Sequence, residues 1–124
     1  MPVRKEFRDV MRFWKVLRTN PRLRWAYARM AMGGGERKAL QLLTVKLSVP
    51  IENVRELYVR MRNTHNRKYA VQETINVLQQ IDELAEKLNL HSTPWLQNNL
   101  RQRKPEEVLQ DLHLQAQQVG ALAA

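Results

Sequence analysis

Apolar side chains recur at helical spacing along this chain, and no stretch shows the alternation of apolar and polar residues that favours a strand. The pattern is longest over residues 68–88, where one stripe comprises Val71, Ile75, Leu78, Ile81, Leu84 and Leu88. A stripe of this kind stabilises a fold only when other helices cover it. The sequence therefore predicts an all-α protein.

Proline and glycine divide the N-terminal half into segments. Asn20-Pro21 ends a helix expected over residues 3–19 and begins a second helix over residues 22–32. The triplet Gly33-Gly34-Gly35 predicts a flexible hinge after the second helix.

Four further helices are expected downstream of the triplet. Ser48-Val49-Pro50 separates a helix over residues 36–47 from one over residues 51–63. After the helix over residues 68–88, we expect a short turn around Trp95 and a last helix that begins at Pro105.

Composition limits what the 124 residues can do. Hydrophobic residues make up 44%, enough for one modest core, and the absence of cysteine excludes disulfides and thiolate metal sites. No apolar run reaches the roughly 20 residues of a membrane span, and the N-terminus lacks the apolar core of a secretory signal. The three histidines are far apart, and no nucleophile or paired carboxylate stands out, so we expect neither a metal site nor enzymatic activity.

Positive charge is concentrated in the first 70 residues. The formal net charge is +9, and residues 1–70 hold 17 Lys and Arg against five Asp and Glu, whereas residues 71–124 hold four against seven. On the expected first helix, a cationic stripe of Arg8, Arg12, Lys15 and Arg18 runs beside an apolar stripe of Phe7, Val10, Met11 and Trp14. This combination indicates an acidic partner.

Nucleic acid is one class of acidic partner. Residues 40–63 have the helix–break–helix pattern of a DNA-binding unit, but Glu52 and Glu56 near the start of the second helix would repel phosphates, so we expect no DNA partner. The density of cations in residues 1–70 also suits RNA, as in a basic helical subunit of a ribosome, including a mitochondrial one. That alternative stays open.

Two segments carry a resemblance to a known family. Arg8-Asp9-Val10-Met11-Arg12-Phe13-Trp14 takes the place of an Arg-Glu-Leu-Tyr-Arg-x-Trp motif, with Val10-Met11 where the motif has Leu-Tyr. Val54-Arg55-Glu56-Leu57-Tyr58 follows Thr44-Val45-Lys46 as in a later helix of the same proteins. The chain thereby resembles the LYR-motif family of small mitochondrial three-helix proteins, and within it the accessory subunits on the matrix arm of respiratory complex I.

The resemblance implies a function and a location. A LYR-like three-helix bundle with an inserted helical segment would occupy residues 1–90, and residues 91–124 would form a C-terminal helical tail. The protein would be a non-catalytic accessory subunit on the matrix side of the mitochondrial inner membrane, in contact with other subunits of a large complex. It would bind mitochondrial acyl carrier protein and no cofactor of its own, since the acyl-4'-phosphopantetheine belongs to that partner.

The residues expected to meet such a partner form two sets. The acidic surface would contact the cations Arg8, Arg12, Lys15, Arg18, Arg55 and Arg62. The acyl chain would enter a slot lined by Phe7, Val10, Met11, Trp14, Leu57, Tyr58 and Met61, where each buried methylene contributes ~0.8 kcal/mol.

Overall fold

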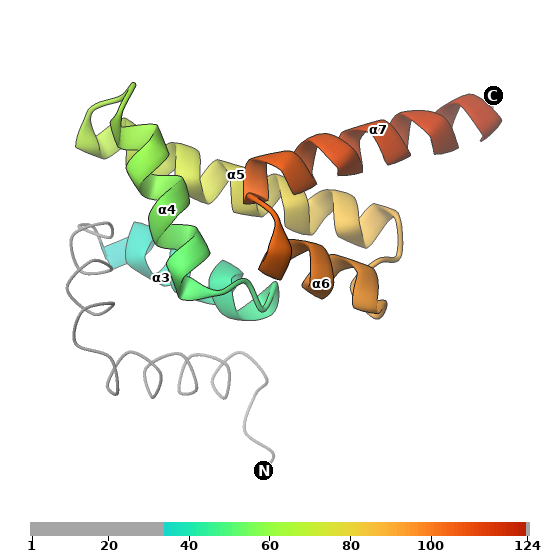
Figure 1. The fold of residues 1–124 in the computed structure, drawn as a ribbon, viewed down its shortest axis with the longest axis horizontal. Coiled ribbons are helices and arrows are strands. Elements are labelled where there is room, and N and C mark those ends of the chain that lie inside the picture. Colours follow the sequence, from blue (N-terminus) through green and yellow to red (C-terminus); the bar gives the residue numbers. More distant parts are fainter. Residues whose placement is uncertain (1–33, 124) are drawn as a thin grey trace, which may run out of the picture.

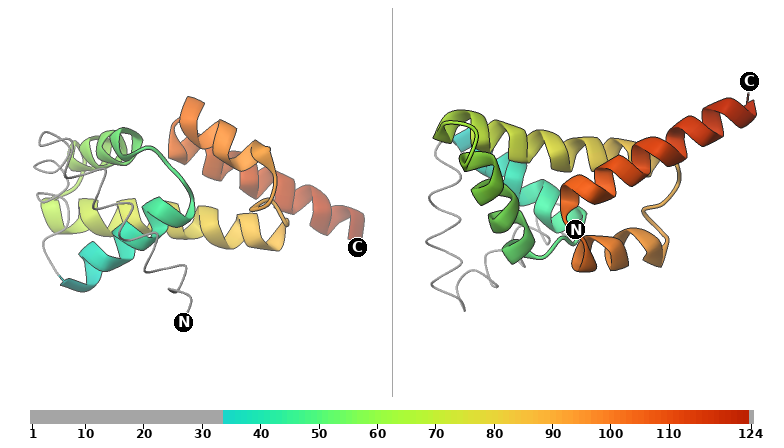
Figure 2. Two further views of the ribbon diagram at one scale, coloured as in Figure 1. Left: turned by 90° about the horizontal axis from the view of Figure 1, so that it is seen from below. Right: turned by 45° about the horizontal axis from the view of Figure 1, so that its top comes forward.

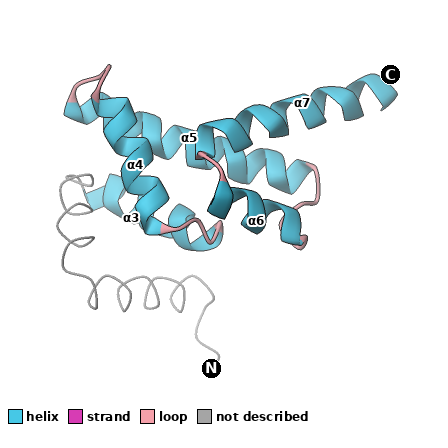
Figure 3. Ribbon diagram, viewed as in Figure 1, coloured by secondary structure: helices cyan, strands magenta, loops and turns pink. Residues whose placement is uncertain are grey.

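The computed structural model describes residues 34–123, which form five helices and no strand (Figures 1 and 3). The helices are α3 (Gly34–Lys46), α4 (Ile51–Arg62), α5 (Arg67–Lys87), α6 (Pro94–Gln102) and α7 (Pro105–Ala123). The expected all-α class is confirmed for this part of the chain. The helices expected over residues 3–19 and 22–32 lie outside the described residues.

Helix boundaries follow local chemistry. Pro50 directly precedes α4, and the side-chain oxygen of Asn66 caps α5 by accepting a hydrogen bond from the backbone N–H of Tyr69 at 3.0 Å. Helices α3 and α5 are followed by left-handed residues, Ser48 with φ 53° and Asn89 with φ 54°. A left-handed residue just after a helix turns the chain so that its next N–H groups satisfy the last carbonyls.

Two expected elements are wrong. Gly34 and Gly35 are the first two residues of α3 rather than part of a hinge, because glycine also adopts helical dihedrals. The short turn expected around Trp95 is the nine-residue helix α6. Pro94 supplies its first turn, and burial of Leu96 and Leu100, four residues apart, stabilises the rest.

Helix α5 lies at the centre of the arrangement. It contacts α3, α4 and α7, while α6 packs against α7. Figures 1 and 2 show α3 and α4 beside the first half of α5, α6 below its second half, and α7 running alongside and past it. Because α5 has neighbours on several sides, its buried residues extend beyond the expected stripe to Ala70, Thr74 and Ala85. These small side chains let neighbouring helices approach closely.

One hydrophobic core joins all five helices. Its buried members are Leu40, Leu47, Val49, Val54, Leu57, Val77, Leu78, Ile81, Ala85, Leu96, Leu100, Val108 and Leu112. The last four belong to α6 and α7, so the core crosses the division expected at residue 90. Within residues 34–123, no helix combines the length and the apolarity that crossing a membrane requires.

The core position of Leu57 can be tested against an exposed neighbour on the same helix. Leu57 is fully buried, whereas Val59 is 44% exposed. We expect Leu57→Ala to lower the free energy of unfolding by about 2–5 kcal/mol, because it leaves a cavity. Val59→Ala should change it by less than about 0.5 kcal/mol. Urea denaturation followed by circular dichroism measures both, and equal effects would place Leu57 outside the core.

Candidate functional site

Helix α4 positions the described candidate residues. Its buried residues, Val54 and Leu57, fix which side faces the core. Successive helical residues are rotated by about 100°, so the remaining side chains fall on two flanks and an outer face. Both flanks carry arginine.

The first flank alternates apolar and cationic residues. Ile51, Arg55, Tyr58 and Arg62 are separated by four, three and four residues, and this spacing places them in one row along the helix. Arg55 and Arg62 are exposed, while Ile51 and Tyr58 are half-buried and pack against the core. We call this row the Arg55–Arg62 flank. It offers positive charge and apolar surface together.

Arg62 is held in place at the end of the helix. Its guanidinium donates a hydrogen bond to the carbonyl oxygen of His65, at 3.0 Å. A cation at the C-terminus of a helix is also favoured by the helix dipole. The charge at this end of the flank is therefore oriented by the fold.

The structure separates the candidate slot residues on α4. Tyr58 lies on the Arg55–Arg62 flank, Met61 is half-buried against the core, and Leu57 is fully enclosed within it. In this arrangement a ligand reaches Leu57 only if the helices separate. The other candidates are outside the described residues: the cations Arg8, Arg12, Lys15 and Arg18, and the apolar residues Phe7, Val10, Met11 and Trp14.

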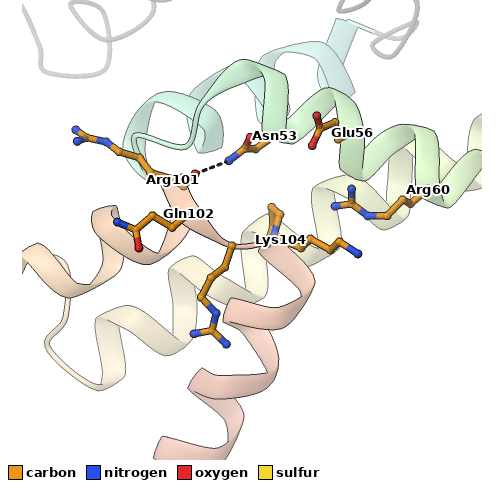
Figure 4. Close-up of a pocket in the computed structure, with 8 residues that line it drawn as sticks. Asn53, Glu56, Arg60, Arg101, Gln102 and Lys104 are labelled. Atoms are coloured by element: carbon orange, nitrogen blue, oxygen red, sulfur yellow. Dashed lines mark hydrogen bonds between the residues drawn. The ribbon is translucent and has the colours of Figure 1, made fainter.

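The second flank of α4 faces α6 and α7. Nδ2 of Asn53 donates hydrogen bonds to the carbonyl oxygens of Leu100 at 2.9 Å and of Arg101 at 3.4 Å, which joins α4 to the end of α6. Figure 4 shows the bond to Arg101. Beside this contact lies a hollow of about 140 Å³. We call it the junction hollow, and its lining residues are Asn53, Glu56, Arg60, Arg101, Gln102, Arg103, Lys104 and Pro105.

A two-point ion pair joins α4 to α7 beside the junction hollow. Nε and Nη2 of Arg60 donate to the two carboxylate oxygens of Glu106, at 2.6 and 2.7 Å. Burial raises the pKa of Glu106, but hydrogen bonds from Arg60 and the backbone, with the charges of Arg60 and Lys104, outweigh it and hold the pKa below its usual value. The hydrogen bond to Glu106 raises the pKa of Arg60.

Arg103 is fixed in a similar way. Its Nη1 donates to Oδ1 of Asn99 at 3.0 Å and to Oδ2 of Asp111 at 2.9 Å. The hydrogen bonds from Arg103 and then from Gln115 lower the pKa of Asp111. Two of the four cations that line the hollow are therefore anchored by carboxylates that are not part of its lining.

The other two cations of the hollow have no such anchor. Neither Arg101 nor Lys104 forms an ion pair within 4 Å with any residue of the described segment. Figure 4 shows Lys104 extending toward Arg60, with Arg101 at the opposite edge. This cluster was not predicted from the sequence. The available signal was the run Arg101-Gln102-Arg103-Lys104, three cations in an otherwise acidic half.

One histidine of the described segment, His91, lies beside a carboxylate that also pairs with a lysine. Asp82, whose side chain is 13% exposed, lies 2.9 Å from Nζ of Lys46 and 3.0 Å from Nε2 of His91. This contact links α3, α5 and the loop that precedes α6. Across residues 34–123, no three His, Cys, Asp or Glu side chains are grouped so that they could hold a metal ion.

Comparison of the chain with protein-family models, with curated proteins and with solved structures found no match.

The Arg60–Glu106 pair makes a pH-dependent contribution to stability. Glu106→Gln should lower the free energy of unfolding at neutral pH by about 1 kcal/mol, the upper range for a partly exposed pair. The folded-state pKa of Glu106 is depressed, so its stabilising contribution is complete above the unfolded-state pKa and is lost as pH falls through the folded-state value. The Tm values of the two proteins should therefore converge as pH falls from about 7 to about 3.

Glu107→Gln is the matched control for this comparison. Glu107 lies in the same first turn of α7, is exposed and forms no ion pair with a described residue. Its substitution should lower Tm less at neutral pH. An equal loss in both variants would mean that the helix dipole, and not the pair with Arg60, accounts for the effect.

Proposed function

We propose that this chain is a non-catalytic accessory protein that docks an acidic protein through a surface that includes the Arg55–Arg62 flank. The observation that carries the proposal is the alternation along α4 of two exposed cations with two half-buried apolar side chains. Exposed cations accelerate and orient the encounter with an acidic surface. The ring of Tyr58 offers apolar contact area beside them.

The resemblance to LYR-motif proteins suggests which acidic protein this is. We propose mitochondrial acyl carrier protein as the partner and the matrix side of complex I, at the inner membrane, as the location. Part of the resemblance rests on the segment Val54-Arg55-Glu56-Leu57-Tyr58. This segment lies within α4 and supplies Arg55 and Tyr58 to the flank. This arrangement supports the partner proposal on the α4 side.

The proposed partner brings an acylated phosphopantetheine. Tyr58 and Met61 are half-buried and Leu57 is enclosed, so contact with the acyl chain begins at Tyr58 and Met61. Methionine is flexible and fills irregular apolar space, which suits a position that an acyl chain contacts. Deeper insertion would require α4 to move away from the core.

Charge reversal on the flank tests the proposal. The double variant Arg55→Glu, Arg62→Glu should weaken binding of acylated mitochondrial acyl carrier protein by about tenfold or more, which corresponds to about 1.4 kcal/mol. Isothermal titration calorimetry with the full chain measures the Kd. Circular dichroism at the same temperature verifies that the variant is folded.

A matched pair of substitutions controls for net charge. Lys38 and Lys87 are exposed residues of α3 and α5, and Lys38→Glu, Lys87→Glu changes the total charge by the same amount. The control should bind nearly as tightly as the original protein. Equal weakening in both double variants, or unchanged binding in the flank variant, would contradict docking on this flank.

The RNA-binding alternative makes a different prediction for the same proteins. Binding to RNA releases counterions, so its affinity falls steeply and linearly on a log–log plot against salt. Tight, steeply salt-dependent binding to an RNA fragment, with no measurable binding to acyl carrier protein, would replace the proposed function by that alternative.

A further inference from the structure

We propose that the junction hollow between α4, α6 and α7 is a binding site for a phosphate group. The site lies on the opposite flank of α4 from Arg55 and Arg62, and the proposal does not rest on the proposed function. The hollow combines a concave shape with two cations that form no ion pair with described residues.

The walls of the hollow are held by contacts between helices far apart in sequence. Asn53 binds the carbonyl oxygens at the end of α6, and Arg60 binds Glu106 of α7 at two points. Arg103 is held by Asn99 and Asp111. Asn53, Arg60 and Arg103 are therefore already positioned, which reduces the conformational entropy that a ligand must remove when it binds.

The anchored arginines still have donors to offer. Arg60 uses Nε and Nη2 for Glu106, so its Nη1 group forms none of the hydrogen bonds found among described residues. Arg103 uses only Nη1. A guanidinium has five N–H donors in a planar fork, and phosphate oxygens accept such donors in pairs.

The remaining charges favour an anion. Arg101 and Lys104 have no ion-pair partner among the described residues, and Glu56 is the only carboxylate in the lining. Lys104 also directly precedes Pro105, the first residue of α7. The helix dipole disfavours a cation at that end, so Lys104 lowers local stability unless an anion is nearby. Glu106 compensates part of the positive charge of Lys104, and a phosphate in the hollow would compensate the rest.

The N–H donors and cations of the hollow suit a phosphate group from either of two classes of ligand. A phosphate monoester on a small metabolite or nucleotide carries up to two negative charges on three terminal oxygens. A phosphodiester of a nucleic-acid backbone carries one. Both present oxygens to the same donors.

The test is a titration of the full 15N-labelled chain with inorganic phosphate, at constant ionic strength maintained with chloride. We expect saturable changes in the NMR signals of Arg60 Nε–H and the Asn53 side-chain amide. The variant Arg101→Gln, Lys104→Gln should weaken phosphate binding by about fivefold or more, since it removes both unneutralised cations. The control Lys38→Gln, Lys87→Gln, which leaves the lining intact, should leave the affinity unchanged.

A variant that increases affinity guards against misfolding as an explanation. Glu56→Gln removes the one carboxylate of the lining and should tighten phosphate binding by about twofold or more. Changes that do not saturate, or an affinity that is the same in the original protein and in both hollow variants, would overturn the site. Neither outcome affects docking on the Arg55–Arg62 flank.

Two organic probes distinguish the sources. Tighter binding of a nucleoside 5'-monophosphate than of a dinucleoside monophosphate supports the site and assigns it to a small phosphorylated ligand. The reverse order also supports the site and assigns it to a nucleic-acid backbone. Failure of both probes, together with inorganic phosphate, to give saturable binding would overturn the proposal.

Discussion

The packing of other helices around α5 determines the rest of this structure. Helix α5 buries residues toward α3, α4 and α7, and one core runs through all five described helices. Because Val54 and Leu57 must face that core, the rotation of α4 about its own axis is fixed. The same constraint places Arg55 and Arg62 on one flank and Asn53 and Arg60 on the other. Both proposed sites are consequences of how one helix is buried.

Three of the seven acidic residues in the C-terminal half form ion pairs within the fold. Glu106 neutralises Arg60, Asp111 neutralises Arg103, and Asp82 lies between Lys46 and His91. The charge of these three carboxylates is therefore balanced by cations of the same chain. In the described part of the chain, the surface cations that form no ion pair with a carboxylate include Arg55, Arg62, Arg101 and Lys104. Net charge alone does not reveal this distribution, which depends on which carboxylates are used internally.

Sequence patterns predict the local features of this protein better than the contacts between distant segments. Helical spacing and the residues Pro50 and Pro105 placed α4, α5 and the start of α7 to within about a residue, because proline geometry acts over short distances. Helix α6 was missed because burial of Leu96 and Leu100 in the shared core stabilises it. Arg55 and Arg62 lie away from the apolar stripe of α4, as their spacing in the sequence indicates. The junction hollow does not follow from such spacing, since Asn53 and Leu100 are 47 residues apart in the sequence.

Helix α7 has a mechanical consequence for the hollow at its base. Its 19 residues span about 28 Å, with Glu106 and Asp111 fastened near the start and the later turns projecting past the body in Figure 1. A helix of this kind acts as a stiff lever. A partner bound to its free end would therefore exert a torque on the ion pairs of Glu106 with Arg60 and of Asp111 with Arg103, beside the junction hollow.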